Sequence, residues 1–259
     1  MIRLHKKFGQ VFLIDKNIVE NICKYADIKD NEIILEIGAG TGNLTEKLLK
    51  YAKQVISVEY SDKLACILRD KFNTEIEAGK LILIEGDALK IDFPYFDKIV
   101  SNIPYQISSP LLFKFFKYRF KKAILLVQKE FALRLVALPG TENYSRLSVN
   151  AYYFGITKIL DHVSRSCFRP VPNVDSAIID IVPHHIMNTA DENTFFEVTK
   201  LLFSQRRKMI KNILNIKDIP YANRRVESLS PEEIIEIADY IFSKNLINFV
   251  DIARLNEKD

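Results

Sequence analysis

The stretch Ile33-Ile-Leu-Glu-Ile-Gly-Ala-Gly-Thr-Gly42 decides the fold of this 259-residue chain. Its first five residues form an apolar run typical of a buried strand, and the glycines suit a tight turn that opens a helix over about 43–52. The N-terminus of such a helix offers free N–H groups to a polar ligand. The spacing is GxGxG rather than the GxGxxG of the dinucleotide fingerprint, because Asn43 stands where that pattern needs glycine.

Strand and helix patterns continue to alternate after this stretch. Further strands are expected at 54–59, 81–85, 98–101 and 123–127, with helices at about 62–72 and 109–117. This alternation predicts an α/β fold with a doubly wound parallel sheet. Two later runs, Ser148–Phe154 and Ala177–Val182, predict an antiparallel addition at the edge of the sheet.

The C-terminal quarter of the chain has a different pattern. After the polar stretch His184–Asn193 the periodicity is helical, and Ser230-Pro-Glu-Glu233 is a strong helix start. We therefore expect a catalytic α/β domain at residues 1–187 and a small all-α domain at residues 188–259.

Two acids follow the strands next to the glycine turn. Glu59 closes the second strand, where a carboxylate can accept both hydroxyls of a ribose. Asp87, in Gly86-Asp87-Ala88, closes the third strand, where it can accept the exocyclic amine of adenine. The glycine turn with Glu59 supports a nucleotide-type ligand. Asp87, together with Ser101-Asn-Ile-Pro-Tyr105 at the end of the fourth strand, favours S-adenosyl-L-methionine over a dinucleotide. The predicted cofactor-binding residues are Gly38, Gly40, Gly42, Glu59 and Asp87.

The charges are unevenly distributed. The net charge is +4, from 37 Lys and Arg against 33 Asp and Glu, but residues 1–8, 114–122 and 203–225 together carry +14. Such blocks suggest a binding surface for a polyanion. The three cysteines have no CxxC spacing, so we expect neither a disulfide framework nor a metal site. Without a signal peptide or an apolar run of about 20 residues, the chain is expected to be cytoplasmic with no membrane partner.

The fourth strand ends in Ser101-Asn-Ile-Pro-Tyr105, and here the sequence resembles the adenine-amine methyltransferases. More closely, it resembles the small-subunit rRNA adenine N6,N6-dimethyltransferases, which are bacterial KsgA and its archaeal and eukaryotic counterparts. The resemblance covers almost the whole chain, through seven motifs at Lys7–Asp15, Glu36–Thr45, Asn102–Phe113, Gln128–Gly140, Tyr144–Ser148, Phe168–Ser176 and Phe203–Lys208.

This resemblance implies a class I S-adenosylmethionine-dependent methyltransferase fold, which is Rossmann-like. It places Gln10, Val11 and Leu13 against the cofactor, and Phe168 on one face of the target adenine. Bacterial members usually have Asn at the position of Val11, so a side-chain hydrogen bond is lost there. Gln106 likewise replaces a usual Asn.

The residues Asn102 to Tyr105 suit methylation of an adenine amine, which is a poor nucleophile that must be held in line with the methyl group. The side-chain oxygen of Asn102, which also borders the cofactor, and the carbonyl of Ile103 can accept the hydrogens of the amine. Pro104 stiffens the turn, and Tyr105 offers a ring on which an extruded base can stack.

The remaining basic residues predict an RNA surface. Arg206, Arg207, Lys208 and Lys211 lie at helical spacing, with apolar residues on the other side of the expected helix. The resemblance implies the substrate: two adjacent adenosines in the 3′-terminal hairpin loop of small-subunit rRNA, each receiving two methyl groups in a pre-ribosomal particle during ribosome biogenesis. The enzyme is expected to act as a monomer.

Three alternatives remain at this point. An Erm-type enzyme would dimethylate one adenine of large-subunit rRNA, although Pro110–Phe113 and Val174–Ala177 look more like the small-subunit group. A DNA adenine methyltransferase should carry a dedicated base-reading domain, for which about 70 helical residues are thin. An RNA-binding ribosome-assembly factor without activity would have no need of intact Glu59, Asp87 and Asn102–Tyr105.

Overall fold

The computed structural model describes residues 11–184, 190–216 and 218–246. The chain divides into two compact units. The first contains Met1–Ala132 and Lys158–Pro183, and the second contains Leu133–Thr157 and His184–Asp259. Each unit has its own cluster of buried apolar side chains.

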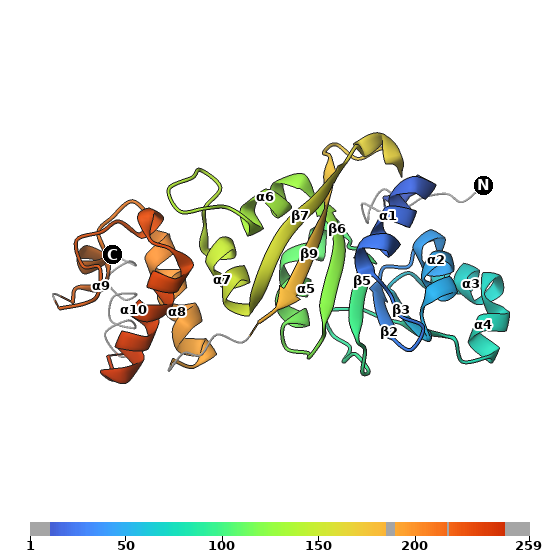
Figure 1. Cartoon of the computed structure of the whole chain (residues 1–259), viewed down its shortest axis with the longest axis horizontal. Helices are drawn as coiled ribbons and strands as arrows, with labels where there is room; N and C mark the ends of the chain where they lie inside the picture. The colour runs from blue at the N-terminus through green and yellow to red at the C-terminus, as the bar shows by residue number, and fades with distance from the viewer. Residues whose placement is uncertain (1–10, 185–189, 217, 247–259) are drawn as a thin grey trace. The chain divides into compact units, whose positions relative to one another are not determined.

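The first unit is built on a seven-stranded sheet with the order β4-β3-β2-β5-β6-β9-β7 (Figure 1). Its five parallel strands are β2 (Ile33–Ile37), β3 (Gln54–Glu59), β4 (Leu81–Glu85), β5 (Lys98–Asn102) and β6 (Lys122–Gln128). The central strands are buried along most of their length, which is why they read as continuous apolar runs. The predicted doubly wound parallel sheet is confirmed.

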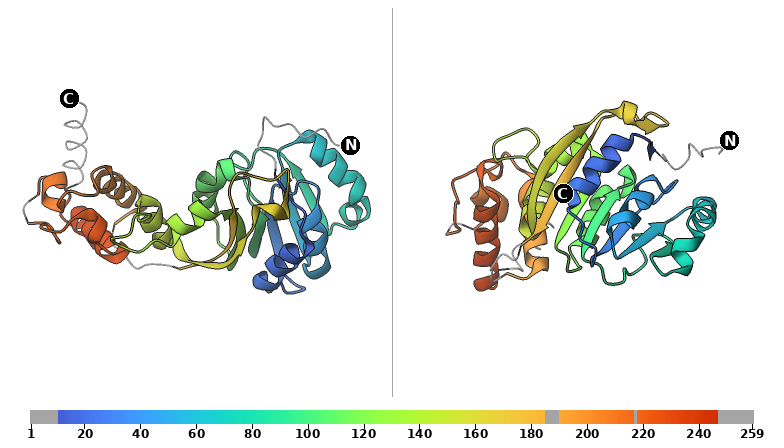
Figure 2. Two further views of the ribbon diagram at one scale, coloured as in Figure 1. Left: turned by 90° about the horizontal axis from the view of Figure 1, so that it is seen from above. Right: turned by 45° about the vertical axis from the view of Figure 1, so that its right-hand side comes forward.

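Helices cover both faces of this sheet. They are α1 (Lys16–Ala26), α2 (Asn43–Tyr51), α3 (Asp62–Lys71), the short α4 (Asn73–Glu77) and α5 (Ser108–Phe115). Right-handed crossovers place α2 and α3 on one face and α5 on the other. In the left view of Figure 2, α1 and α2 lie on one side of the strands and α5 on the opposite side.

The winding of the sheet reverses between β2 and β5, which are neighbours although β3 and β4 separate them in the chain. At such a switch point, the loops after the two strands diverge and leave a crevice at the carboxyl edge. The glycine turn follows β2, and Asn102 ends β5. The two most informative motifs of the sequence therefore lie side by side.

One of the two predicted antiparallel strands is correct and the other is wrong. β9 (Ser176–Pro183) pairs antiparallel with β6, as predicted for 177–182. Residues 148–154 instead belong to a helix, α7 (Arg146–Phe154), and the edge strand beside β9 is β7 (Gly155–Val163). The Ser148 hydroxyl fixes the helix start, because it accepts from the N–H of Ser145 and donates to the carbonyl of Arg134.

The second unit is helical and includes more of the chain than the predicted C-terminal domain. Its described helices are α7, α8 (Glu192–Ser204), α9 (Ile210–Leu214) and α10 (Pro231–Ser243), and α6 (Lys129–Leu135) leads into it. The start predicted at Ser230 is confirmed as a capping box. Residues 133–157, which the sequence pattern places in the catalytic domain, group with α8 and α10. The reason is that Tyr144 and Val149 are buried in the core of this unit.

Candidate active site

A cavity of about 300 Å³ lies at the switch point of the sheet, entirely within the first unit. The segments that line it come from the ends of four parallel strands and from the N-terminal segment. They are 11–13, 36–41 with 43–44, 58–60 with Leu64, 86–89 and 102–107. Nearly all the predicted cofactor-binding and catalytic positions that the structure describes border this one space.

The glycine turn is shaped by what packs against it. Gly38 has φ +75°, and a Cβ there would lie 3.2 Å from Cγ of Pro104. Gly40 has φ +60°, and a Cβ there would lie 3.0 Å from the ring of Phe12. Gly42, with φ +79°, precedes the first residue of α2. Because a side chain at position 38 would crowd Pro104, glycine there allows the glycine turn and the Asn-Ile-Pro-Tyr turn to approach each other closely.

Glu59 is the buried carboxylate of the cavity, with an exposed fraction of 4%. Its Oε2 accepts from the N–H of Gly40 and its Oε1 from the N–H of Ser61, both at 2.9 Å. Burial raises the pKa of Glu59, and these backbone bonds oppose the rise without cancelling it. The backbone of Tyr60 also hydrogen-bonds to this carboxylate, so its remaining acceptor capacity, about one of four sites, is what a ligand hydroxyl can use.

Asp87 lies in the loop that follows β4. Its Oδ1 accepts from the N–H of Leu89 at 2.9 Å, and its other oxygen lies 3.8 Å from Nζ of Lys90. The loop is also held from α5, where Nζ of Lys114 donates to the carbonyls of Ala88, at 2.9 Å, and Ile91. In the sequence, Lys114 is one of five cations in the basic block 114–122. The sequence does not reveal that it bonds to these two carbonyls.

The turn after β5 holds the predicted catalytic group. The N–H of Ile103 donates to the carbonyl of Leu126 in β6 at 3.1 Å, and the N–H of Ile107 donates to the carbonyl of Pro104. Within the described part of the chain, the side-chain amide of Asn102 makes no hydrogen bond, so its oxygen is available to a ligand. The Tyr105 hydroxyl lies 2.7 Å from Oγ of Ser176.

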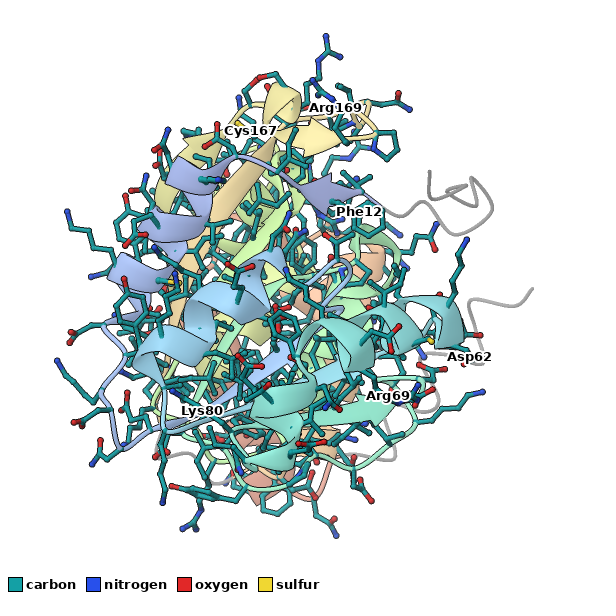
Figure 3. The ribbon with its side chains drawn as sticks, turned by 90° about the vertical axis from the view of Figure 1, so that its right-hand side faces the viewer. Phe12, Asp62, Arg69, Lys80, Cys167 and Arg169 are labelled. Carbon is teal, nitrogen blue, oxygen red and sulfur yellow. The ribbon has the colours of Figure 1, made fainter. Side chains whose placement is uncertain are left out.

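The N-terminal segment covers one side of the cavity. Val11 and Leu13 line it, whereas Gln10 lies outside the described residues. β1 (Phe12–Leu13) pairs with β8 (Phe168–Arg169), so that Phe12 lies opposite Arg169, as Figure 3 shows. Phe168, predicted to contact the base, is fully buried against Leu13 and does not line the cavity.

Two residues in this region, Glu36 and Ser176, are absent from the site predicted from the sequence. Glu36 is buried at the end of β2, where its Oε2 accepts from the hydroxyls of Thr45, at 2.7 Å, and Ser57, at 2.6 Å. Burial raises the pKa of Glu36 to about 7. An acid within the apolar run 33–37 was a visible signal of this site. Ser176, the partner of Tyr105, gave no such signal.

The predicted RNA-binding helix is interrupted. α8 ends at Ser204 and α9 begins at Ile210, so Arg206, Arg207 and Lys208 lie in the turn between them. This segment instead runs antiparallel to residues 222–227. The N–H of Ile210 donates to the carbonyl of Arg224, and that of Glu227 to the carbonyl of Arg206. Pairing with residues 222–227 therefore supplies the backbone hydrogen bonds that a helix would have supplied here.

The four predicted RNA-binding side chains differ in their surroundings. Arg206 is a structural clamp, because its guanidinium donates to the carbonyls of Glu142 and Tyr144 at 3.1 and 2.9 Å and lies 3.8 Å from Glu227. Arg207, Lys208 and Lys211 are exposed and form no ion pair within the described part of the chain. Arg225, which faces Met209 across the antiparallel segments, is likewise exposed.

The residues that the structure describes contain no group of three His, Cys, Asp or Glu side chains that could hold a metal ion. Nor does any helix among them have the length and apolar character needed to cross a membrane.

Known proteins resemble this chain over most of its length. Residues 1–246 match the family described as ribosomal RNA adenine dimethylase. The chain is 44% identical to the probable ribosomal RNA small subunit methyltransferase A of Methanosarcina acetivorans, over 91% of this chain and 93% of that protein. It resembles the crystal structure of a dimethyladenosine transferase from Plasmodium falciparum with a TM-score of 0.80 and 32% identity, over 90% of this chain and 98% of that one.

A second solved structure bears on the Erm alternative. The 23S rRNA methyltransferase ErmE matches with a TM-score of 0.71 and 26% identity, over 88% of this chain and 98% of that one. Both solved structures match this chain in the class I methyltransferase fold. The extent of the family match and the identity to its relatives show that this chain belongs to the ribosomal RNA adenine dimethylase family of enzymes.

Proposed function

We propose that this enzyme transfers methyl groups from S-adenosyl-L-methionine to the N6 amines of two adjacent adenosines in the 3′-terminal hairpin loop of small-subunit rRNA, making N6,N6-dimethyladenosine at each. The observation that carries the proposal is the single cavity bordered by the glycine turn, the carboxylates of Glu59 and Asp87, and the Asn102–Tyr105 turn. One half of the cavity, with the glycine turn, Glu59 and Asp87, suits a nucleoside. The other half, formed by Asn102–Tyr105, can hold an amine.

The residues of the first half fit the cofactor. Gly38 and Gly40 have positive φ angles that side chains rarely adopt, and a Cβ at either would crowd Pro104 or Phe12. Their backbone lines the cavity and can border a ligand directly. Glu59 would accept the ribose hydroxyls, and Asp87 the adenine amine. When bound, S-adenosyl-L-methionine supplies an electrophilic sulfonium methyl group. Val11 and Leu13 would cover it from the N-terminal segment.

The residues of the second half orient the target amine. The oxygen of Asn102 and the carbonyl of Ile103 accept its two hydrogens, which directs the nitrogen lone pair toward the methyl group. The ring of Tyr105 stacks on the extruded base, a contact that typically contributes about 1–3 kcal/mol. The methylated amine is acidic enough to lose its proton to water, so the site needs no strong general base.

The small-subunit substrate is supported by the relatives. The Methanosarcina protein, at 44% identity, is named for the small subunit, whereas ErmE, at 26%, is named for 23S rRNA. Exposed Arg207, Lys208 and Lys211 would contact rRNA phosphates, while Arg206 would act by holding the loop at 142–144. We propose further that the enzyme works as a monomer in the cytoplasm, on a pre-ribosomal particle.

The substrate can be tested by supplying labelled S-adenosyl-L-methionine and one of three RNAs. These are small subunits that lack the modification, mature small subunits, and large-subunit RNA. After digestion of the RNA, N6,N6-dimethyladenosine is expected from the unmodified small subunits alone. Label in large-subunit RNA would establish the Erm-type activity instead, and binding to the small subunit without transfer of label would establish an assembly factor.

The mechanism can be tested at Asn102. Asn102→Leu removes the side-chain acceptor, and kcat is expected to fall by about 10²-fold or more, by analogy with the loss of one preorganised hydrogen-bonding group. Asn102→Asp keeps an acceptor oxygen in the same place and serves as the matched control, with a smaller loss. Binding of S-adenosyl-L-methionine and of RNA should persist in both variants. Undiminished transfer by Asn102→Leu would refute the mechanism.

A further inference from the structure

Tyr105 and Ser176 form a hydrogen bond that reaches the proposed catalytic turn from a distant part of the chain. The two residues are 71 positions apart, and their hydroxyl oxygens lie 2.7 Å from each other. Tyr105 begins a short 3-10 turn directly after Pro104, and Ser176 is the first residue of β9. Both belong to the first unit.

Ser176 is in a rigid position. It is fully buried, with an exposed fraction of 0%, and it lies opposite Gln128 in the antiparallel pairing of β9 with β6. The backbone next to Tyr105 is tied to the same strand, because the N–H of Ile103 donates to the carbonyl of Leu126. The ring of Tyr105 is therefore fixed at its backbone end through β6 and at its hydroxyl end through β9.

From this geometry we infer that Ser176 is a positioning residue, which holds the ring of Tyr105 in the orientation that stacks on the target adenine. This inference rests on the proposed function. In this arrangement the Tyr105 hydroxyl hydrogen-bonds to Ser176 and not to the base. The ring therefore contributes stacking, and the hydroxyl does not help to distinguish adenine from other bases. A tyrosine side chain has two rotatable bonds, and a ring already held in place loses less freedom when the base arrives.

Replacing Ser176 is expected to lower kcat/KM for RNA through its effect on the ring of Tyr105. Ser176→Ala leaves the ring free to rotate, and kcat/KM for RNA is expected to fall about three- to tenfold, the range for immobilising one side chain. The KM for S-adenosyl-L-methionine should not change, since Ser176 does not line the cavity. Tyr105→Phe removes the other half of the hydrogen bond and is expected to cause a similar loss, with unchanged preference for adenine.

A double-mutant cycle separates positioning from simple damage. Because both single variants break the same bond, adding Ser176→Ala to Tyr105→Phe should cost little more activity. Ser148→Ala is the matched control, since Ser148 is also buried and its hydroxyl also makes a short bond, to the carbonyl of Arg134 at 2.6 Å. It should lower Tm without changing kcat/KM. Fully additive losses in the cycle would overturn the inference.

A measurement without RNA tests the bond directly. In protein labelled with ¹³C at tyrosine Cζ, the Tyr105 signal is identified by its loss in Tyr105→Phe, and it is expected to shift in Ser176→Ala. An unshifted signal would also overturn the inference. If the wild-type enzyme methylates no RNA, the proposed function fails, yet the NMR result still decides whether Ser176 holds the ring.

Discussion

The basic segments 114–122 and 206–225 look alike in the sequence and differ in the structure. In the first, Lys114 donates to backbone carbonyls, Lys121 pairs with Glu32 and Asp97, and Lys122 lies 3.4 Å from Asp180. In the second, Arg207, Lys208, Lys211 and Arg225 are exposed without an ion pair among the described residues. Arg206 and Arg224 of the second segment also have internal partners, in Glu227 and Glu233. Thus the first segment uses three of its five cations within the protein, whereas four of the six described cations of the second segment are exposed without an ion pair.

The position of the first segment supports the same distinction. Lys122 begins β6, whereas the cavity lies where the parallel strands end. Because parallel strands share a direction, Lys122 and its neighbour Lys121 lie at the edge of the sheet opposite the cavity, whereas Lys114 bonds to Ala88, which lines it. A net positive charge in a segment therefore does not identify an RNA surface until the partners of each cation are known.

The largest expected effect is on the free energy of unfolding when Glu32, the buried acid that pairs with Lys121 of the first segment, is replaced. Oε2 of Glu32 lies 2.8 Å from Nζ of Lys98, and its Oε1 lies 3.2 Å from Nζ of Lys121. The side chains of Glu32 and Lys98 are only 6% and 9% exposed. Glu32→Leu leaves the Lys98 ammonium without its carboxylate, so urea titration should show the free energy of unfolding falling by about 3–5 kcal/mol.

The matched control for Glu32 is the acid that pairs with Arg206 of the second segment. Glu227 is 3.8 Å from Arg206, and both side chains are partly exposed. Glu227→Leu should lower the free energy of unfolding by less than about 1 kcal/mol. Equal losses in the two variants would mean that the acids contribute alike and that the comparison of the segments is wrong.

The pKa of Glu32 also predicts how the free energy of unfolding changes with pH. Burial by itself would raise the pKa of Glu32, but the hydrogen bonds from Lys98, the Lys29 N–H and Lys121 outweigh it, so the pKa lies below its ordinary value of 4.5. The folded form then binds protons less tightly than the unfolded form, so the stabilisation is present above about pH 5 and is lost as pH falls. In Glu32→Leu, the free energy of unfolding should decline less steeply below pH 5, as measured by denaturation at several pH values.

The second prediction concerns the exposed cations. The triple variant Arg207→Gln, Lys208→Gln and Arg225→Gln should weaken binding to small-subunit rRNA on the order of 100-fold at low salt. The slope of log affinity against log salt concentration should fall by about one for each phosphate contact removed. Fluorescence anisotropy at several salt concentrations measures both quantities.

Its control uses the exposed cations of the first segment. Lys117 and Arg119 are exposed like those of the second segment, but they flank the lysines that are used internally. Lys117→Gln with Arg119→Gln is expected to leave RNA affinity nearly unchanged. A loss as large as that of the triple variant would show that both segments contact RNA.

A smaller effect is expected on cofactor affinity when Lys114 is replaced, because Lys114 supports the loop that carries Asp87. Lys114→Met removes the amine that holds the carbonyls of Ala88 and Ile91, and therefore loosens the loop that carries Asp87. Binding of S-adenosyl-L-methionine, measured by calorimetry without RNA, should weaken about tenfold, in the range of one hydrogen bond to a charged group. Lys117→Met should leave it unchanged. Weaker RNA binding with normal cofactor binding would return Lys114 to the RNA surface.

These cases show which parts of the molecule the sequence could predict. The strands at 54–59 and 81–85 were located to the residue, because an apolar run bounded by polar residues is a local signal. The same holds for the glycine turn and for the turn at Asn102–Tyr105. The helix at 146–154 was missed, since its first turn depends on the Arg134 carbonyl, which no local pattern reveals.

Long-range partners account for the other differences. Lys121 meets Glu32 across 89 residues, and Tyr105 meets Ser176 across 71. The sequence shows each of these side chains but not its neighbour, so Lys121 counted as a free charge and Ser176 did not stand out. Arg206 was likewise assigned to RNA because its carbonyl partners at Glu142 and Tyr144 belong to a separate loop.

The smallest expected effect tests how much the exposed end of the first network contributes. Lys121 bridges Glu32 and Asp97, but its side chain is 59% exposed, and ion pairs in solvent contribute little to stability. Lys121→Met should lower Tm by no more than about 3 °C, whereas Lys98→Met, which removes the buried partner of the same acid, should lower it by about 10 °C. RNA affinity should stay constant in Lys121→Met. If it falls instead, Lys121 exchanges its internal partners for phosphate, and the first segment belongs to the RNA surface after all.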